Sequence, residues 1–407
     1  MNSSWVLKKL EDAYDVRDGT HDSPKYQKDG YPLITSKNLK PSGLNFDKVK
    51  YISKKDYTKI NQRSAVHTGD LLFAMIGTIG HPIVVETDPN FAIKNVALFK
   101  VPENQDSYFL KYYLETNFVK EKLYREAKGT TQKFVGLGYL RNFQISLPSL
   151  PEQKRIVSIL DEAFEGIDRA IANAEKNLAN SKELFESYLN NVFTQKGDGW
   201  VEKKLDDTCI VERGSSPRPI KSFLTKEADG VNWIKIGDTK YVTKCIISTK
   251  EKITPEGALR SRRVEPGDFI LTNSMSYGRP YIMATTGYIH DGWFVLRLKE
   301  EIDTDFFYHL LTSRVVQEQF RTLAAGAVVK NISSNLVKLA ILPIPKKYQQ
   351  FKIVETIESL SKETQRLEAI YQRKLTALAE LKQSLLQKAF SGELTANDTA
   401  IKEEAVA

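Results

Sequence analysis

The chain contains an internal repeat, and this feature constrains its fold more than any other. The segment Trp5–Asp12 reads WVLKKLED and Trp200–Asp207 reads WVEKKLDD, at an offset of 195 residues. Farther along, Gly69–Leu71 (GDL) matches Gly267–Phe269 (GDF) at an offset of 198 residues. A period of about 197 residues is far too long for a solenoid. The 407 residues therefore predict one module that is used twice.

Proline placement divides each copy into a globular part and a long helix. None of the 15 prolines lies between Glu152 and Ser216, and none follows Pro345. Because proline breaks helix interiors, these two stretches can form helices of about 40 residues, or about 60 Å. We expect globular domains at 1–151 and 197–345, long helices at 152–196 and 346–393, and a disordered tail at 394–407.

Apolar residues in both helical stretches follow the alternating three- and four-residue spacing of a coiled coil. Such a helix cannot bury its apolar stripe alone. We expect the two helices of one chain to pair with each other, and a homodimeric coiled coil is the alternative. The predicted seam consists of Leu160, Ile167, Ile171, Leu178 and Phe185 in the first helix, and Ile357, Leu367, Leu378 and Leu385 in the second.

The segments before the helices carry short β-type runs, such as Gly69–Ile76 and Gly267–Thr272, which are separated by Gly, Pro, Asn and Asp turns. Each segment also has one amphipathic helical stretch, Tyr108–Lys128 in the first and Asp305–Ala324 in the second. This pattern predicts an α+β fold class: two similar mixed domains, dominated by irregular antiparallel strands, that are separated by long helices.

The positive charge of the chain is concentrated on the two predicted domains. The net charge is +8. Residues 1–151 have 22 basic and 16 acidic groups, and residues 197–345 have 21 and 18, so the domains hold +9 and the rest −1. This distribution favours a polyanionic partner such as nucleic acid. No apolar run approaches the length of a membrane span, and we expect no membrane contact. Two cysteines, Cys209 and Cys245, exclude a disulfide framework and favour a cytoplasmic location.

A search for catalytic motifs finds none that is specific. The chain lacks a phosphate-binding glycine loop, an HExxH zinc motif and the Asn-Pro-Pro-aromatic run of amino-methyltransferases. Its five histidines are scattered without metal-ligand spacing. No Asp…Glu-x-Lys nuclease cluster stands out, but this pattern is so degenerate that its absence excludes little. These absences favour a binding protein without a metal site or a catalytic centre.

Three segments resemble the specificity subunits of Type I restriction–modification enzymes. LPSLPEQKRIVSIL (Leu147–Leu160) resembles the conserved-region signature of that family, and LLQKAFSGELT (Leu385–Thr395) resembles its terminal signature. AKGTTQKFVGLGYLRNFQISLP (Ala127–Pro148) resembles the end of a target recognition domain. The resemblance covers essentially the whole chain. The second copy departs from the pattern at Lys346–Tyr348, where the family usually has a tighter junction.

The resemblance implies a non-catalytic DNA-recognition subunit. Each domain would read one half of a bipartite site on double-stranded DNA. The two helices would pack antiparallel about an approximate two-fold axis and set the spacing between the half-sites. Expected partners are two modification subunits, which carry S-adenosylmethionine and methylate adenine, and restriction subunits that use ATP and Mg²⁺. We expect this chain itself to bind no cofactor.

Three other functions remain open at this stage. The first is the recognition subunit of a Type IIB-like system, in which one partner both methylates and cuts. The second is a stand-alone DNA methyltransferase or nuclease, and the third is a structural coiled-coil scaffold.

Base reading needs Arg or Lys for guanine and Asn or Gln for adenine, and phosphate binding needs Lys, Arg, hydroxyls and free N–H groups. Loops in both halves supply these groups, although plain β-turns or solvated loops would look similar. The first half offers Thr20, His21, Lys25, Lys37, Asn38, Thr78, His81, Gly129, Thr130, Thr131, Gln132 and Lys133. The second half offers Arg213, Ser215, Ser216, Arg218, Lys235, Asp238, Tyr277, Arg279, Lys330 and Asn331.

Overall fold

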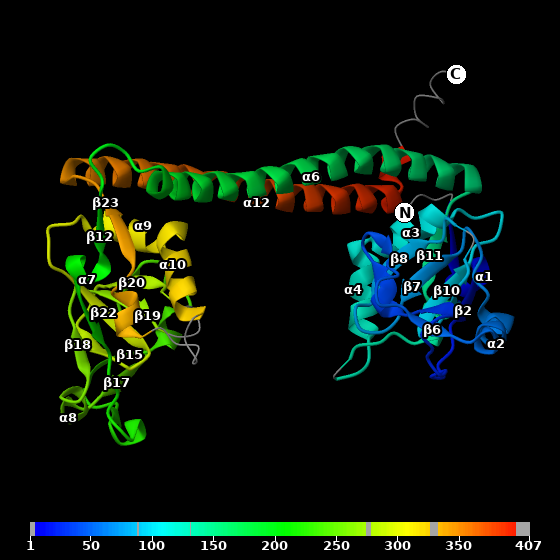
Figure 1. Cartoon of the computed structure of the whole chain (residues 1–407). Helices are drawn as coiled ribbons and strands as arrows, with labels where there is room; N and C mark the ends of the chain where they lie inside the picture. Colours follow the sequence, from blue (N-terminus) through cyan, green and yellow to red (C-terminus); the bar gives the residue numbers. More distant parts are fainter. Residues whose placement is uncertain (1–4, 88, 131, 274–277, 326–332, 396–407) are drawn as a thin grey trace. The chain divides into compact units, whose positions relative to one another are not determined.

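The structure is a computed structural model that describes residues 5–87, 89–130, 132–273, 278–325 and 333–395. The chain divides into two compact units. Unit 1 consists of residues 1–175 and 372–407, and unit 2 consists of residues 176–371. Each unit combines one globular domain with a segment of each long helix (Figure 1). The α+β fold class with two similar domains and two long helices is confirmed.

The main sheet of unit 1 has four antiparallel strands in the order β2-β10-β7-β8. Every residue of β7 is buried, and so are the first four residues of β10. Both faces of these central strands are therefore covered, which explains why their sequences are continuously apolar instead of alternating. The strands are β2 (Asp15–Asp18), β10 (Val96–Lys100), β7 (Leu71–Ala74) and β8 (Gly80–Val84).

Smaller strand groups complete the domain of unit 1. A three-stranded sheet has the order β6-β3-β9, and two further pairs are β1-β11 and β4-β5. Strand β3 pairs antiparallel with β6 but parallel with β9, so the domain is not purely antiparallel. The strands are β6 (Lys50–Ile52), β3 (Tyr31–Ile34), β9 (Ala92–Ile93), β1 (Val6–Lys9), β11 (Gln144–Leu147), β4 (Leu39–Lys40) and β5 (Gly43–Leu44). Short helices are α1 (Leu10–Ala13), η1 (Ser36–Asn38), α2 (Lys54–Ser64) and α5 (Leu137–Asn142).

Unit 2 repeats this plan with larger sheets. Its sheets have the orders β13-β22-β19-β20-β16, β14-β17-β15-β21-β18 and β12-β23. Two of its pairs, β15-β21 and β16-β20, are parallel. The strands are β12 (Val201–Lys204), β13 (Cys209–Arg213), β14 (Leu224–Thr225), β15 (Val231–Ile234), β16 (Cys245–Ile246), β17 (Glu251–Ile253), β18 (Arg262–Val264), β19 (Phe269–Thr272), β20 (Pro280–Met283), β21 (Gly287–Ile289), β22 (Trp293–Leu298) and β23 (Ile341–Ile344). Short helices are α7 (Leu205–Thr208), η2 (Ile220–Ser222), η3 (Ile236–Thr239), α8 (Pro255–Ala258) and α11 (Ser334–Val337).

The amphipathic stretch predicted in each domain forms two helices instead of one. In unit 1, α3 (Ser107–Glu115) and α4 (Asn117–Glu126) are separated by Thr116, whose hydroxyl donates to Tyr113 O and accepts from Val119 N–H. In unit 2, Ser313 separates α9 (Thr304–Thr312) from α10 (Arg314–Ala325). In both copies a buried residue with a hydroxyl side chain lies where the first helix ends and the second begins. It interrupts the helical stretch at the same place in each domain.

The repeated tryptophan anchors each domain to a long helix. In unit 1, the ring of Phe109 in α3 lies 6.2 Å from that of Trp5 and 5.1 Å from that of Phe390. In unit 2, the ring of Phe306 in α9 lies 6.3 Å from that of Trp200 and 5.7 Å from that of Phe193. The repeat in the sequence is therefore also a repeat of tertiary contacts.

The glutamine of the LPEQ-type junction has a structural role. Gln153 is fully buried, accepts from the backbone N–H of Asp106 at 3.0 Å and donates to Pro148 O at 2.9 Å. Gln350 makes the equivalent bonds in unit 2, from Asp303 N–H at 2.8 Å and to Pro345 O at 3.0 Å. The departure in the sequence before Gln350 therefore leaves this junction intact.

The two long helices are α6 (Leu150–Gln195) and α12 (Lys347–Ser391). Within unit 1 the two helices run antiparallel. Asp168 of α6 contacts Lys382 of α12 at 2.9 Å, and the ring of Phe164 lies 4.6 Å from the same ammonium group. Phe164, one turn before Asp168, also packs in one core with Leu386, one turn after Lys382. The predicted seam residues of α6 (Leu160, Ile167, Ile171, Leu178 and Phe185) are all buried or half-buried.

The seam predicted for α12 is wrong over part of its length. Ile357, Leu378 and Leu385 are buried or half-buried, but Leu367 is 38% exposed. From Thr364 onwards the covered positions are Glu368, Tyr371, Leu375 and Leu378, at steps of four, three, four and three residues. Leu367 does not lie on this series. Spacing alone did not separate these two phases because apolar residues occur on both of them.

Candidate nucleic-acid interface

Residues from three predicted loops of unit 1 line one cavity of about 1040 Å³, which we call the basic cavity. Its described lining contains a single acidic residue, Asp47. A concave surface with this charge balance attracts a phosphate backbone. The lysines that line it are Lys37, Lys40, Lys48, Lys50 and Lys94.

The loop at residues 18–21 lies beside the basic cavity and is held against the strand segment that follows β9. Its Gly19 is required by close approach, because a Cβ atom there would lie 2.2 Å from the carbonyl oxygen of Ile93. Thr20 N–H donates to the same oxygen at 3.0 Å. His21 is exposed and lies between Asp18 (2.7 Å) and Asn95 (2.8 Å). Lys25 is exposed and does not line the cavity.

The turn at residues 36–38 places its two candidates differently. Lys37 is exposed and lines the basic cavity. Asn38 is only 6% exposed; its Oδ1 accepts from Thr35 N–H and its Nδ2 donates to Asn45 O. The amide of Asn38 is therefore used to build this turn on the wall of the basic cavity, and DNA binding by Asn38 stays a prediction.

The turn after β7 and the hairpin at residues 128–134 lie side by side. Gly77 N–H donates to Lys133 O at 2.8 Å, and Val135 N–H donates to Met75 O at 2.9 Å. This pairing brings Thr78 and Gln132 onto the wall of the same cavity. Lys133 and Thr130 are exposed at the hairpin, and Thr131 lies outside the described residues.

Gly129 and His81 are among the residues of these loops that have left-handed backbone conformations. Gly129 has φ +100°, and a Cβ atom there would lie 2.3 Å from Gln132 O, so the hairpin requires glycine. His81 has φ +50° and also lines the basic cavity. Burial lowers the pKa of His81, and the charges of Lys120 and Lys40 lower it further, so its imidazole is neutral near pH 7.

In unit 2 the loop that corresponds to residues 18–21 of unit 1 has the same backbone hydrogen bonds but different side chains. Gly214 N–H donates to Trp293 O at 2.9 Å, and Ser215 N–H donates to Ile289 O at 3.2 Å. Ser216 donates to the carboxylate of Asp291 at 2.8 Å. The guanidinium groups of Arg213 and Arg218 are both exposed and both lie against Asp291.

The remaining candidates of unit 2 are less available. Asp238 accepts from Lys235 N–H at 2.8 Å and from Lys250 N–H at 3.2 Å, so it builds a turn like that of Asn38. Its contact with DNA stays a prediction. Lys235 is paired with Glu251 at 2.5 Å. Arg279 is exposed, with its guanidinium 5.3 Å from the ring centre of Tyr281. Tyr277, Lys330 and Asn331 lie outside the described residues.

Sequence reasoning missed several residues of this surface. Lys94 and Asn95 follow the two-residue strand β9, and Lys48 and Lys50 flank the start of β6. Asp291 occupies the corresponding position after β21 in unit 2. The only signal in the sequence was polar residues directly after short apolar runs, which is common at strand ends.

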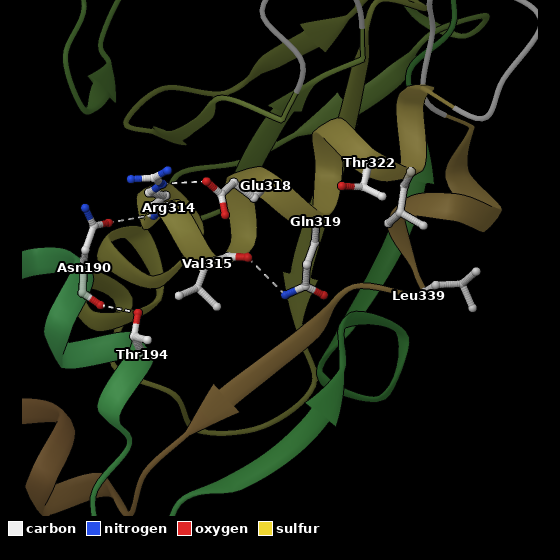
Figure 2. Close-up of a pocket in the computed structure, with 9 residues that line it drawn as sticks. Asn190, Thr194, Arg314, Val315, Glu318, Gln319, Thr322 and Leu339 are labelled. Carbon is white, nitrogen blue, oxygen red and sulfur yellow. Dashed lines mark hydrogen bonds and ion pairs between the residues drawn. The ribbon is translucent and has the colours of Figure 1, made fainter.

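Figure 2 shows a different cavity, in unit 2, between α10 and the C-terminal part of α6. It has a volume of about 720 Å³, and Asn190 Oδ1 accepts from Arg314 N–H at 3.3 Å on its wall. Unit 1 has a comparable cavity of about 990 Å³, where Gln383 Oε1 accepts from Asn117 N–H at 3.1 Å. Of the candidate DNA-reading residues that the structure describes, none lines either cavity.

Among the residues that the structure describes, no group of three or more His, Cys, Asp or Glu side chains is arranged to hold a metal ion. Within the same ranges, no helix is both long and apolar enough to cross a membrane.

Comparison with protein families gives a match to both halves of the chain. The profile of the Type I restriction modification DNA specificity domain matches residues 2–178 and again residues 197–376. The chain is 22% identical to the putative type I restriction enzyme MjaX specificity subunit of Methanocaldococcus jannaschii, over 88% of this chain and 86% of that protein. It is 23% identical to the Type I restriction enzyme EcoBI specificity subunit of Escherichia coli, over 97% of this chain and 87% of that one.

Two solved structures share the fold. A chain from a study of complex assembly and conformational transition of the type I R-M system gives a TM-score of 0.77 with 18% identity, over 97% of this chain and 99% of that one. The HsdS subunit from Thermoanaerobacter tengcongensis gives a TM-score of 0.61, also with 18% identity, over 97% and 98% of the two chains.

Proposed function

The chain belongs to the Type I restriction modification DNA specificity family, and from this premise we propose that it is the DNA sequence-recognition subunit of a Type I restriction–modification complex. Each domain reads one half of a bipartite site on double-stranded DNA. The chain has no catalytic role, and adenine methylation and DNA cleavage belong to its partners. Such a subunit works in the cytoplasm, where the DNA of a bacterial or archaeal cell lies.

One observation carries this proposal: the two units present different side chains on the same backbone frame. Gly19 and Gly214 both donate to the carbonyl of the strand that pairs with the loop, at 3.0 and 2.9 Å. The polar groups that follow are the exposed His21 and Lys25 in unit 1, but the half-buried Ser216 and the exposed Arg218 in unit 2. A duplicated frame with different donors and acceptors suits the reading of two different half-sites.

The basic cavity of unit 1 supports DNA as the ligand. Five lysines line it, and lysine binds the phosphates that position a protein on the duplex. Gln132 and Thr78 lie on the same wall and supply the amide and hydroxyl groups that read base edges.

We propose that the partners are two modification subunits, which carry S-adenosylmethionine, and restriction subunits that use ATP and Mg²⁺. The cavities beside α4 and α10 support a partner that binds twice. They lie at equivalent places in the repeat, and their linings include the exposed apolar side chains of Phe118 in unit 1 and Leu339 in unit 2, which are 57% and 50% exposed.

The deciding experiment combines the purified chain with its methyltransferase partner and maps the adenines methylated in a DNA library. A bipartite site with a fixed gap is expected. Methylation or cleavage by the chain alone would contradict the proposal and favour a stand-alone enzyme. A Type IIB-like system would be identified by a single partner that both methylates and cuts. DNA binding without sequence preference or strong salt dependence would favour a scaffold.

A second experiment tests the spacer role of the helices. Removing one heptad, about 10.5 Å of helix, from both α6 and α12 preserves the apolar seam. The gap between the half-sites should change while the half-site sequences remain the same. A control that removes the same number of residues from the tail after Thr395 should leave the gap unchanged. A change in the half-sites themselves would contradict the spacer role.

A further inference from the structure

Asn95 and Asp291 occupy equivalent positions in the two units. Asn95 lies two residues after β9, and Asp291 lies two residues after β21. Both strands pair in parallel with the strand that leads to the second predicted loop, β3 in unit 1 and β15 in unit 2. The carbonyl oxygen of the last strand residue, Ile93 or Ile289, accepts an N–H from the loop that we call the first recognition loop, residues 18–25 in unit 1 and 213–218 in unit 2.

In unit 1, Asn95 connects two loops. Its backbone N–H donates to Thr20 O at 3.2 Å, and its backbone oxygen accepts from the hydroxyl of Ser36 at 3.3 Å. Its side-chain Oδ1 lies 2.8 Å from Nδ1 of His21. The backbone has φ +53°, a conformation that asparagine adopts more readily than most residues.

In unit 2, Asp291 holds four polar groups. Its carboxylate accepts from the hydroxyl of Ser216 at 2.8 Å and lies 3.6 Å from the guanidinium of Arg218. Its backbone oxygen accepts from Arg213 Nε at 3.2 Å and from Asn273 Nδ2 at 2.6 Å. Partial burial raises the pKa of Asp291, but the bond from Ser216 and the charges of His290 and Arg218 outweigh it, so the pKa lies below its ordinary value.

We propose that Asn95 and Asp291 are positioning residues that set the specificity of their own half-site by orienting the first recognition loop. The inference rests on the proposed function, since it assumes that these loops read DNA. The difference between the two residues has a consequence. The neutral amide of Asn95 orients an imidazole, whereas Asp291 orients two arginines, Arg218 through its carboxylate and Arg213 through its backbone oxygen.

Oriented arginines suit guanine, because a guanidinium makes two parallel hydrogen bonds to O6 and N7. The half-site read by unit 2 should therefore depend on at least one guanine. Holding the arginines in one arrangement before DNA arrives reduces the ordering cost of binding. Loss of the Asp291 carboxylate should then weaken discrimination between bases more than it weakens total affinity for DNA.

The test uses the assembled complex with its methyltransferase partner and maps methylated sites in a randomised DNA library. D291A should relax discrimination at one or two positions of one half-site by about tenfold or more, and leave the other half-site unchanged. D291N keeps an oxygen that accepts from Ser216, so it should retain most of the discrimination. S216A should relax the same half-site as D291A, and N95A should relax the other half-site.

The matched control is D229A, which removes an exposed acidic side chain of unit 2 and should change neither half-site. Melting temperatures of all variants should lie within a few degrees of the parent chain, which separates loop positioning from general destabilisation. Unchanged half-sites in D291A and S216A, or equal relaxation of both half-sites, would overturn this inference. A parent complex without any bipartite site would instead refute the proposed function.

Discussion

The backbone N–H of Gly77 donates a hydrogen bond to the carbonyl oxygen of Lys133 at 2.8 Å. This bond joins two loops that are more than 50 residues apart in the sequence. Since both partners are backbone atoms, the side chains of Gln132 and Lys133 remain exposed beside Thr78. A turn and a hairpin thereby form one polar surface.

The first prediction concerns those two side chains. Replacing Gln132 and Lys133 with alanine leaves the backbone bond in place but removes one amide and one charge. DNA binding by the assembled complex should weaken, and the slope of log affinity against log salt should fall by about one unit for the lost lysine. The control is K59A, an exposed lysine of α2 outside the basic cavity. Unchanged affinity and specificity would remove this hairpin from the interface.

The second prediction uses glycine geometry. G129A places a Cβ atom 2.3 Å from Gln132 O at φ +100°, so the hairpin must open. DNA binding should weaken about as much as in the Gln132 and Lys133 double variant. G43A is the matched control, because Gly43 also has positive φ (+111°) but nothing lies within 4 Å of its added Cβ atom. Binding measured by fluorescence anisotropy compares them, and equal losses in the two variants would contradict a specific role for the hairpin.

The third prediction concerns the buried glutamines. Q153A removes an amide that bonds Asp106 N–H and Pro148 O, and Q350A does the same at Asp303 and Pro345. Each variant leaves buried polar groups without partners and should lower the free energy of unfolding by about 1–3 kcal/mol. Chemical denaturation measures this loss. Q349A is the control, because Gln349 is half-buried and its side chain makes bonds at exposed positions. It accepts from Lys346 N–H and donates to Asp198 O.

The fourth prediction separates apolar packing from charge between α6 and α12 in unit 1. F164A removes a ring that is 4% exposed and should destabilise the unit by about 3–5 kcal/mol. D168A breaks an ion pair with Lys382 in which Asp168 is 60% exposed, and should cost less than about 1 kcal/mol. Thermal melting distinguishes the two. A larger loss in D168A would mean that charge holds these helix segments together.

The fifth prediction is a pH effect at His309. Burial lowers the pKa of His309 to about 4, with a further decrease from the charge of Lys244. Because the unfolded chain takes up this proton at a pKa of about 6.5, stability should fall as the pH drops from about 6.5 towards 4. At pH 5 this group accounts for a loss of roughly 2 kcal/mol relative to pH 7.

H309Q removes the titrating group and is the test variant. Its free energy of unfolding should change less between pH 7 and pH 5 than that of the parent chain. H290Q offers a comparison, since burial lowers the pKa of His290 as well but Asp291 opposes the shift. An identical pH dependence in H309Q and the parent chain would contradict a buried neutral imidazole at this position.

Much of the fold was predictable because it depends on local patterns. The stretches without proline correspond to α6 and α12, and every predicted seam position of α6 is buried or half-buried. The two helices around Thr116 were predicted as one, because the seam of apolar residues continues across a residue that caps a new turn. Leu367 was assigned to the covered face of α12 but is exposed. The sequence of a helix does not show which of two apolar faces a neighbouring element will cover.

The interface was less predictable for the same reason. Lys37, Gln132 and His81 could be selected by residue type, and the structure brings them to one cavity. Asn38 has equally suitable chemistry, yet its amide is consumed by its own turn. Asn95 was missed because it connects two loops that meet only after the sheet has formed.

The sequence by itself determined the duplication, the separation of domains from helices, the charge on the domains and the family resemblance. These features are periodic or compositional, so they can be read along the chain. Only the tertiary structure decided which polar groups are exposed, which are used inside turns and which residues anchor the loops. Those outcomes depend on hydrogen bonds between residues far apart in sequence, such as His21 and Asn95, and no local pattern records such pairs.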